Sequence, residues 1–229
     1  MPKGGKGNNG NGNGGVIDNQ PVTSGSDGDD IINAENKING GDGNDIITAS
    51  DGADRVNAGD GDDRVAGGAG DDTLYGNDGW DTAVFSGDIR DYSFSDGKGN
   101  AFIVDGADGT DTLKHFEELE FDNFTIYLDG RNNTQLVEDH AMIVSEDSDG
   151  TIDLLAGAWD FEGDTLTVTG ASGGTLNDSD FSFDASGNYD HLALGESTTK
   201  EFTFSVTDGT NVTTNTVTVT IEGENDATV

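Results

Sequence analysis

The chain has 229 residues, a formal net charge of -36 at pH 7, and no cysteine. This charge excludes a protein that binds the phosphate backbone of nucleic acids, because such a protein needs a basic surface. Without cysteine there are no disulfides and no thiolate metal sites, and no window is long and apolar enough to cross a bilayer. An acidic surface of this kind points to cations as partners.

Residues 1–24 are rich in glycine and asparagine, which predicts a flexible leader. The first fifteen residues carry charge but no apolar run, so they do not read as a secretory signal peptide. The chain also stops abruptly at Val229. We therefore expect it to be part of a longer multidomain protein.

A nine-residue repeat follows over residues 25–84. Every full copy has glycine at its fourth position, aspartate at its sixth and an apolar residue at its eighth. The fixed glycine indicates a positive φ angle or a close backbone approach, and the single apolar residue predicts a short strand after a polar turn. One such unit cannot bury its apolar residue alone, so the copies are expected to stack. The copies begin at Gly25, Gly40, Ala49, Ala58, Gly67 and Gly76, and a truncated turn, AENKIN, follows the first.

Stacked copies bring their aspartates together, and basic residues are too few to neutralise them. Only Lys37, Arg55 and Arg64 are basic between residues 25 and 84. A hard cation with oxygen ligands would relieve the repulsion, and the flexible coordination of calcium suits carboxylates and turn carbonyls better than the octahedron of magnesium. The candidate ligands are the aspartates at the third and sixth positions: Asp27, Asp30, Asp42, Asp45, Asp51, Asp54, Asp60, Asp63, Asp72, Asp78 and Asp81.

At these residues the chain resembles the RTX (repeats-in-toxin) family, whose nonapeptide is G-G-x-G-x-D-x-aliphatic-x. The resemblance implies a parallel β-roll in which two nonapeptides make one coil and calcium lies between stacked turns. Departures are mild, such as alanine at the first position of two copies. The alternative is a disordered Asp/Gly linker, which would have no reason to keep an aliphatic residue in phase.

After Val84 the nine-residue period stops, and residues 85–132 are predicted to form a β cap. Short strands are expected near 91–95, 101–104, 109–113, 116–121 and 124–128, where aromatic residues concentrate. A stacked roll ends in an open edge, so a terminal unit with its own core must close it. The segment is also similar to the region that follows the repeats in many RTX proteins.

Residues 133–229 show strand-like runs at the spacing of a sandwich. Two of them, EFTFSVTD and TNTVTVTIEG, alternate apolar and polar residues, which predicts half-buried antiparallel strands in an immunoglobulin-like β-sandwich. Four short segments are similar to motifs of the cadherin-like repeats of bacterial surface adhesins: SED, DLLAGAWDFEGDTLTV, VTDG and GEND. This resemblance implies calcium at one end of the domain, and the alternative is a solvated acidic loop. The implied ligands are Asp160, Glu162 and Asp164, with Glu146, Asp147, Asp208 and Asp226 as weaker candidates.

The sequence contains no recognisable catalytic motif, and we predict that the chain is not an enzyme. The three histidines are scattered without zinc spacing, and neither a G-x-S-x-G elbow nor a cysteine nucleophile is present. Carboxylate pairs are abundant, but turns and calcium sites account for them. Trp80 and Trp159 are candidates for stacking on a sugar ring, and the more conservative interpretation is that each plugs an edge of the fold.

The sequence therefore predicts an all-β chain with Ca2+ as its cofactor: an RTX β-roll, its cap, and an immunoglobulin/cadherin-like sandwich. Resemblance to RTX proteins implies secretion by the one-step (type I) route. We expect a structural or adhesive segment of a bacterial surface adhesin or exoprotein that folds on calcium outside the cell. The alternatives are a calcium-dependent module that binds carbohydrate, such as an exopolysaccharide or a cell-surface glycan, and the non-catalytic tail of a secreted hydrolase.

Overall fold

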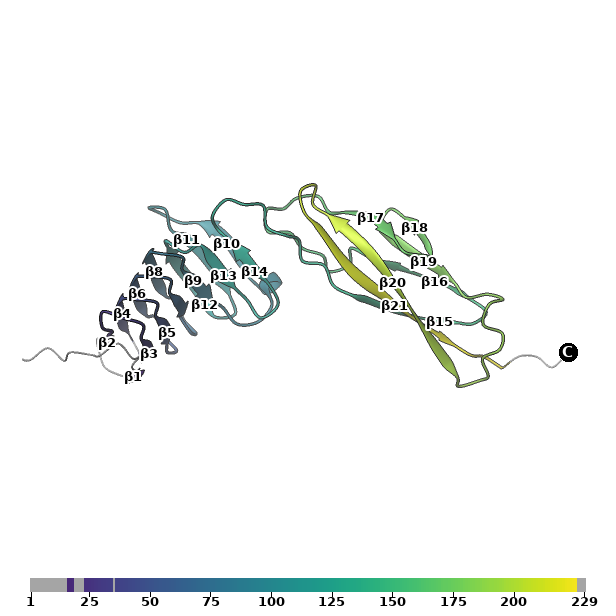
Figure 1. Ribbon diagram of the computed structural model, residues 1–229, viewed down its shortest axis with the longest axis horizontal. Coiled ribbons are helices and arrows are strands. Elements are labelled where there is room, and N and C mark those ends of the chain that lie inside the picture. Colours follow the sequence, from purple (N-terminus) through teal and green to yellow (C-terminus); the bar gives the residue numbers. More distant parts are fainter. Residues whose placement is uncertain (1–15, 19–22, 35, 226–229) are drawn as a thin grey trace, which may run out of the picture. The chain divides into compact units, whose positions relative to one another are not determined.

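The computed structural model describes residues 16–18, 23–34 and 36–225, and the chain divides into two compact units, Met1–Arg131 and Asn132–Val229 (Figure 1). Most of the predicted leader, and the candidate ligand Asp226, lie outside the described residues. Within the described part the leader already contributes to the fold, because Val16–Asp18 and Thr23–Ser24 are strands that pair with the first repeat copies.

The first unit is a β-roll of two seven-stranded sheets between which the chain alternates. One sheet has the order β1-β3-β5-β7-β9-β13-β14 and the other β10-β11-β12-β8-β6-β4-β2. Repeat strands within each sheet are parallel, so two nonapeptides make one coil, as predicted. The first sheet comprises β1 (Val16–Asp18), β3 (Ile31–Ala34), β5 (Ile46–Ala49), β7 (Arg64–Ala66), β9 (Thr82–Val84), β13 (Glu118–Glu120) and β14 (Thr125–Tyr127). The second comprises β2 (Thr23–Ser24), β4 (Lys37–Asp42), β6 (Arg55–Asp60), β8 (Thr73–Asp78), β12 (Gly109–Lys114), β11 (Phe102–Gly106) and β10 (Ser93–Asp96).

The core of the roll consists of the apolar residues at the eighth repeat position. Ile47, Val65 and Ala83 lie in register on neighbouring strands of one sheet, and each is at most 1% exposed. The other sheet contributes a matching row that includes Val56 and Leu74, both fully buried. One larger inward side chain per short strand, joined in three strands by the small residues Ala34, Ala49 and Ala58, gives a narrow core, which is why single copies must stack.

The glycine at the fourth position is required by the stacking of the turns. Gly61 has a φ angle of +127°, and a Cβ atom built there would lie 2.3 Å from the carbonyl oxygen of Gly43 in the neighbouring coil. Any other residue would therefore be strained in its backbone and would push the coils apart.

The cap contains an antiparallel hairpin and an aromatic cluster. A 3-10 turn, Ile89–Asp91, leads into β10, which pairs antiparallel with β11. The rings of Phe85, Tyr92 and Phe121 pack together, with centroids 4.9 to 5.7 Å apart. Parallel pairing nevertheless continues beyond Val84, because β12 lies beside β8 and β13 beside β9. Two further half-coils of the roll thus lie within the segment that the sequence assigned to the cap.

The second unit is a seven-stranded sandwich, which confirms the predicted immunoglobulin-like architecture. Its sheets have the orders β15-β21-β20-β17 and β16-β19-β18. Fully buried Leu154 and Phe181 pack with Phe204 and Val217 in one continuous core. The strands are β15 (His140–Ser145), β16 (Asp149–Asp153), β17 (Thr167–Ala171), β18 (Thr175–Asn177), β19 (Asp180–Asp184), β20 (Ser197–Thr207) and β21 (Val212–Glu222). The two runs that alternate apolar and polar residues in the sequence form β20 and β21, which pair antiparallel as predicted.

Candidate metal centre

Two columns of side chains follow the two rows of turns along the roll. In each column a backbone N–H at the sixth position donates to the carboxylate of the next coil: Asp45 to Asp63 Oδ1 at 2.8 Å, and Asp54 to Asp72 Oδ1 at 2.7 Å. The first column consists of Asp30, Asp45, Asp63, Asp81 and Glu117, and the second of Asn36, Asp54, Asp72 and Asp111. Each carboxylate therefore uses one oxygen to hold the stack together.

The other carboxylate oxygen is the informative one. The Oδ2 atoms of Asp45, Asp63, Asp72 and Asp81 are buried, and none has a hydrogen-bond partner among the described residues. A buried carboxylate oxygen without a partner is costly, because it loses hydration and gains nothing in return. Four such atoms at equivalent positions are oxygens that a cation could bind.

In the copies that begin with glycine, the first repeat position provides room beside these oxygens. A Cβ atom at Gly40 would lie 2.3 Å from Oδ2 of Asp45, and one at Gly76 would lie 2.4 Å from Oδ2 of Asp81. Glycine at this position therefore lets the carboxylate turn back against its own turn. The six to eight oxygen ligands that calcium takes include backbone carbonyls, and these turns offer carbonyls close to the carboxylates.

Burial raises the pKa of the column carboxylates. The pKa reaches about 6 for Asp45, Asp72 and Asp81, and about 7 for Asp63 and Asp111, mainly because the charged form is removed from water. Neighbouring carboxylates raise these pKa values further, while the donated backbone N–H lowers them. Near neutral pH, each column carboxylate therefore either keeps its proton or repels the charged carboxylates next to it.

The third-position aspartates behave differently, since all five candidates are exposed. Asp42, Asp60 and Asp78 lie in register on neighbouring strands, and Asp27 forms a bridge to Asp42. Their carbonyls, rather than their carboxylates, join the stack: Gly43 N–H donates to Asp60 O at 2.7 Å. Asp51 lies in the other row of turns. Among the described residues, no three His, Cys, Asp or Glu side chains cluster as a ready metal site, so turn carbonyls would have to complete the coordination.

One turn of the second column was missed by the sequence analysis. Gly106–Lys114 reads GADGTDTLK, a nonapeptide separated from the others by the hairpin insertion. Gly109 has a φ angle of +124°, and its Cβ atom would lie 2.1 Å from Gly70 O, as in the regular copies. The N–H of Asp72 donates to Asp111 Oδ1 at 2.8 Å. The spacing of glycine, aspartate and leucine is the signal in the sequence, but the hairpin insertion separates this copy from the continuous run of repeats.

In the sandwich, the loop after Trp159 carries the three predicted carboxylates, but among the described residues they do not cluster as a ready metal site. Asp160 Oδ1 accepts the Asp164 N–H at 2.8 Å, and its buried Oδ2 has no partner among the described residues. Glu162 accepts from the side-chain amide of Asn133 at 2.8 Å. Burial, followed by the nearby carboxylates of Glu162, Asp164 and Asp208, raises the pKa of Asp160. Amide donors thus hold much of this loop without a cation.

The weaker candidates in the sandwich are divided between its two ends, with Asp208 near Asp160 and Glu146 far from it. Asp208 lies in the turn before β21 and accepts the N–H groups of Thr210 and Asn211, both at 2.6 Å. Glu146 is fully buried beyond the opposite end of β21, where it accepts the Glu224 N–H at 2.7 Å. The structure therefore separates residues that the sequence grouped in one site.

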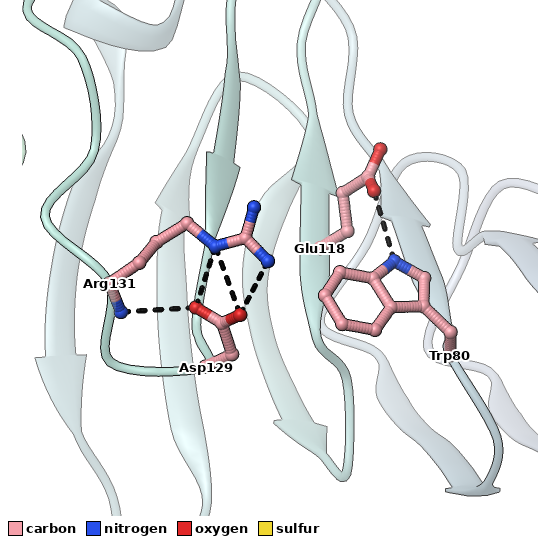
Figure 2. A network of polar contacts seen from close by, with 4 residues as sticks. All are labelled: Trp80, Glu118, Asp129 and Arg131. Carbon is pink, nitrogen blue, oxygen red and sulfur yellow. Dashed lines mark hydrogen bonds and ion pairs between the residues drawn. The ribbon is translucent and has the colours of Figure 1, made fainter.

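Trp80 lies on the surface of the roll within a polar network (Figure 2). Its indole N–H donates to Glu118 Oε2 at 3.1 Å, and its ring centroid is 6.2 Å from that of Tyr127. Arg131, which is paired with Asp129, lies 4.2 Å from the centre of the Tyr127 ring. With 38% of its surface exposed, Trp80 does not plug the core of the roll. Trp159 is half-buried, and its backbone pairs with Leu136.

Comparison with known families agrees with this geometry. The model of the RTX calcium-binding nonapeptide repeat matches residues 33–65 and 57–88, and the model of a bacterial Ig domain matches residues 132–222. The chain is an RTX β-roll joined to a bacterial Ig domain. The RTX match ends before the turn at Gly106–Lys114, so the structure extends the repeat region beyond what the sequence pattern detects.

Solved structures resemble the chain only distantly. The endo-fucoidan hydrolase MfFcnA4 from glycoside hydrolase family 107 is 18% identical, with 58% of this chain and 22% of that chain covered and a TM-score of 0.29. The endo-fucoidan hydrolase MfFcnA9 is also 18% identical, with 56% and 25% covered and a TM-score of 0.26. The RTX–Ig chain thus spans about a quarter or less of these proteins, and such TM-scores support no argument about function. No curated protein matches the sequence, and no helix in the described part is long and apolar enough to span a membrane.

Proposed function

We propose that this RTX–Ig chain is a calcium-binding segment of a secreted or surface-exposed bacterial protein, and that its roll folds when it meets calcium outside the cell. The four buried Oδ2 atoms without partners carry the proposal. RTX repeats and bacterial Ig domains are typical of extracellular proteins, which supports the location. The proposed role is structural or adhesive, with no catalysis assigned to this chain.

The chain's own residues set the condition for folding. In the roll, the sixth-position backbone amide of one turn receives the carboxylate of the next turn in its column, so the carboxylates of successive turns lie close together. The aliphatic row is too narrow to offset both this repulsion and the entropy of ordering a glycine-rich chain. When bound, calcium would supply the positive charge that the columns lack, and would stabilise the folded roll by about 2.7 kcal/mol per site at a hundredfold excess over its dissociation constant.

The ligands of such sites would be the sixth-position carboxylates together with turn carbonyls. Full turns stack in both columns, so the roll would hold several ions rather than one. Asp45, Asp63 and Asp81 serve the first column, and Asp54, Asp72 and Asp111 the second. In the Ig domain, Asp160 is the carboxylate best placed for a further ion, because its Oδ2 is buried without a partner in the described structure.

The test is a calcium titration of the full chain, followed by far-ultraviolet circular dichroism and by isothermal titration calorimetry. We expect cooperative gain of β signal with binding of several calcium ions, and a much weaker response to magnesium, whose coordination is stricter. A roll with the same β signal in excess chelator as in calcium would refute calcium-conditioned folding. Binding of a single ion would refute the assignment of both columns.

A further inference from the structure

One face of the roll gathers basic side chains in an otherwise strongly acidic molecule. Strands β4, β6, β8 and β12 are neighbours in one sheet (Figure 1). Their outward positions form two rows in register. We call these eight residues the basic face: Lys37, Arg55, Thr73 and Thr112 in one row, and Asn39, Asn57, Tyr75 and Lys114 in the other. Three of the eight are basic and none is acidic, although the whole chain has 46 acidic residues and only 10 Lys and Arg.

These three cations also differ from the arginines elsewhere in the roll. Arg64, Arg90 and Arg131 each form an ion pair with a carboxylate. By contrast, Lys37, Arg55 and Lys114 have no carboxylate partner among the residues that the structure describes. In a chain with this excess of acid, cations without carboxylate partners on one face are charges left available to a ligand.

The groups between the cations are held in place and are polar. Arg55 lies 4.4 Å from the centre of the Tyr75 ring and donates to its hydroxyl at 3.0 Å, while Lys114 lies 5.6 Å from the same ring. The Asn57 amide donates to Asn39 Oδ1 at 2.7 Å, and the Asn77 amide to Asn57 Oδ1 at 3.2 Å. Neighbouring strands are about 4.8 Å apart, so the four strands present a regular, rigid surface roughly 14 Å across.

We propose that the basic face binds an acidic polysaccharide that runs across strands β4, β6, β8 and β12. Carboxylate or sulfate groups of the polymer pair with Lys37, Arg55 and Lys114, and its hydroxyls bond to the asparagine side chains. The proposal rests on the proposed function, because the face exists only in the folded, calcium-loaded roll. It names the ligand class and the surface of the adhesive role.

Charge density favours a polysaccharide over a nucleic acid. Duplex DNA carries one charge per about 1.7 Å of its axis and would face the acidic remainder of a chain with net charge -36. A polysaccharide with one acidic group per one or two sugars can place its charges on three spaced cations. Screening over about 8 Å at physiological salt limits the repulsion from more distant aspartates, and calcium in the columns would reduce it further.

The experiment measures binding of the full chain, in excess calcium, to immobilised dextran sulfate and hyaluronate, with neutral dextran as the comparison. We expect binding to both acidic polymers, none to dextran, and an affinity that falls steeply with salt. The triple variant Lys37→Gln, Arg55→Gln, Lys114→Gln should lose roughly tenfold or more in affinity. The double variant Lys37→Gln, Lys114→Gln keeps the Arg55–Tyr75 bond and should lose several-fold.

The matched control is Lys98→Gln, Lys200→Gln, which removes two charges from outside the basic face and should stay within twofold of the wild type. Equal loss in this control, equal binding to dextran, binding insensitive to salt, or no binding by a chain with an intact calcium transition would each overturn the proposal. So would self-association that the triple variant abolishes while polysaccharide binding is unchanged. Circular dichroism in calcium and chelator is recorded for every variant, so a failure of calcium-conditioned folding is seen separately from a failure of binding.

Discussion

The two units have opposite kinds of interior. The Ig domain is filled by large side chains from two sheets, with Phe181, Phe204 and Leu154 almost wholly buried. The roll buries one aliphatic residue at the eighth repeat position of each copy, joined in some strands only by a small alanine, and columns of buried carboxylates flank this core on both sides. The first interior needs nothing from the solvent, whereas the second is complete only when its charges are compensated.

Regular β-structure alone therefore does not determine what stabilises a domain. Both units have continuous backbone ladders and regular strands. In the Ig domain, apolar burial offsets the entropy of folding in the ordinary way. In the roll, the same residues that fix the register also repel one another, so stability depends on the ions and protons of the surroundings.

Removal of calcium should have the largest effect, because it should unfold the roll and leave the Ig domain folded. The chain has two tryptophans, Trp80 in the roll and Trp159 in the Ig domain. Chelator should change the fluorescence of Trp159→Phe, which reports on the roll, through loss of the whole unit. The fluorescence of Trp80→Phe should show the Ig domain still folded. Unfolding of both units together would contradict the comparison.

Acidification in chelator should produce the next largest effect. The column carboxylates have folded-state pKa values of about 6 to 7, above the value of 3.8 that is usual for an aspartate. The folded roll therefore binds more protons than the unfolded chain between about pH 4 and 7, and its stability falls as the pH rises through that window. Lowering the pH from 7.5 to about 5 without calcium should recover part of the β signal. A roll that becomes less folded over this step would show that the carboxylates are not buried as described.

Asp111→Asn tests how far the calcium-binding part of the roll extends. The amide oxygen can still accept the Asp72 N–H, but the charge of the seventh full turn is lost. We expect the calcium midpoint for folding of the roll to rise about tenfold, equivalent to about 1.4 kcal/mol. Asp96→Asn, in the exposed hairpin, is the matched control and should leave the midpoint unchanged. Equal midpoints for the two variants would mean that the calcium-binding part ends at Val84.

The smallest expected effect lies in the Ig domain. Because Asp160 keeps one buried oxygen without a partner in the described structure, calcium should stabilise this domain slightly, by about 1 kcal/mol when it exceeds its dissociation constant several-fold. Urea unfolding of Trp80→Phe in calcium and in chelator measures this, and Asp160→Asn should remove the difference. A difference that persists in Asp160→Asn would place the ion elsewhere, and no difference would favour a solvated loop.

The sequence predicted the roll well because each copy repeats the same physical demand. Gly61 and Val65 could be assigned from their phase alone, and the structure confirms both roles. The turn at Gly106–Lys114 was not recognised because a hairpin separates it from its neighbour, and pairing with β8 is a long-range contact. The basic face could not be predicted from the sequence either, since Lys37 and Lys114 come onto the same face of one sheet only after the chain has coiled. In the Ig domain, the motif resemblance grouped Glu146 with Asp208, but the two residues lie at opposite ends of β21.

The short half-coils at the two ends of the roll have a consequence for how such proteins change length. Asp30 is followed by Asn36, and Asp111 by Glu117, at six residues instead of nine, so each end crosses between columns by a tight turn. Between those ends, the columns advance by 18 residues per coil. Removal of one whole coil would leave both ends correctly joined, whereas removal of one nonapeptide would exchange the two columns and mismatch the cap. Duplication and loss in this roll are therefore expected to proceed by coils, in steps of two repeats.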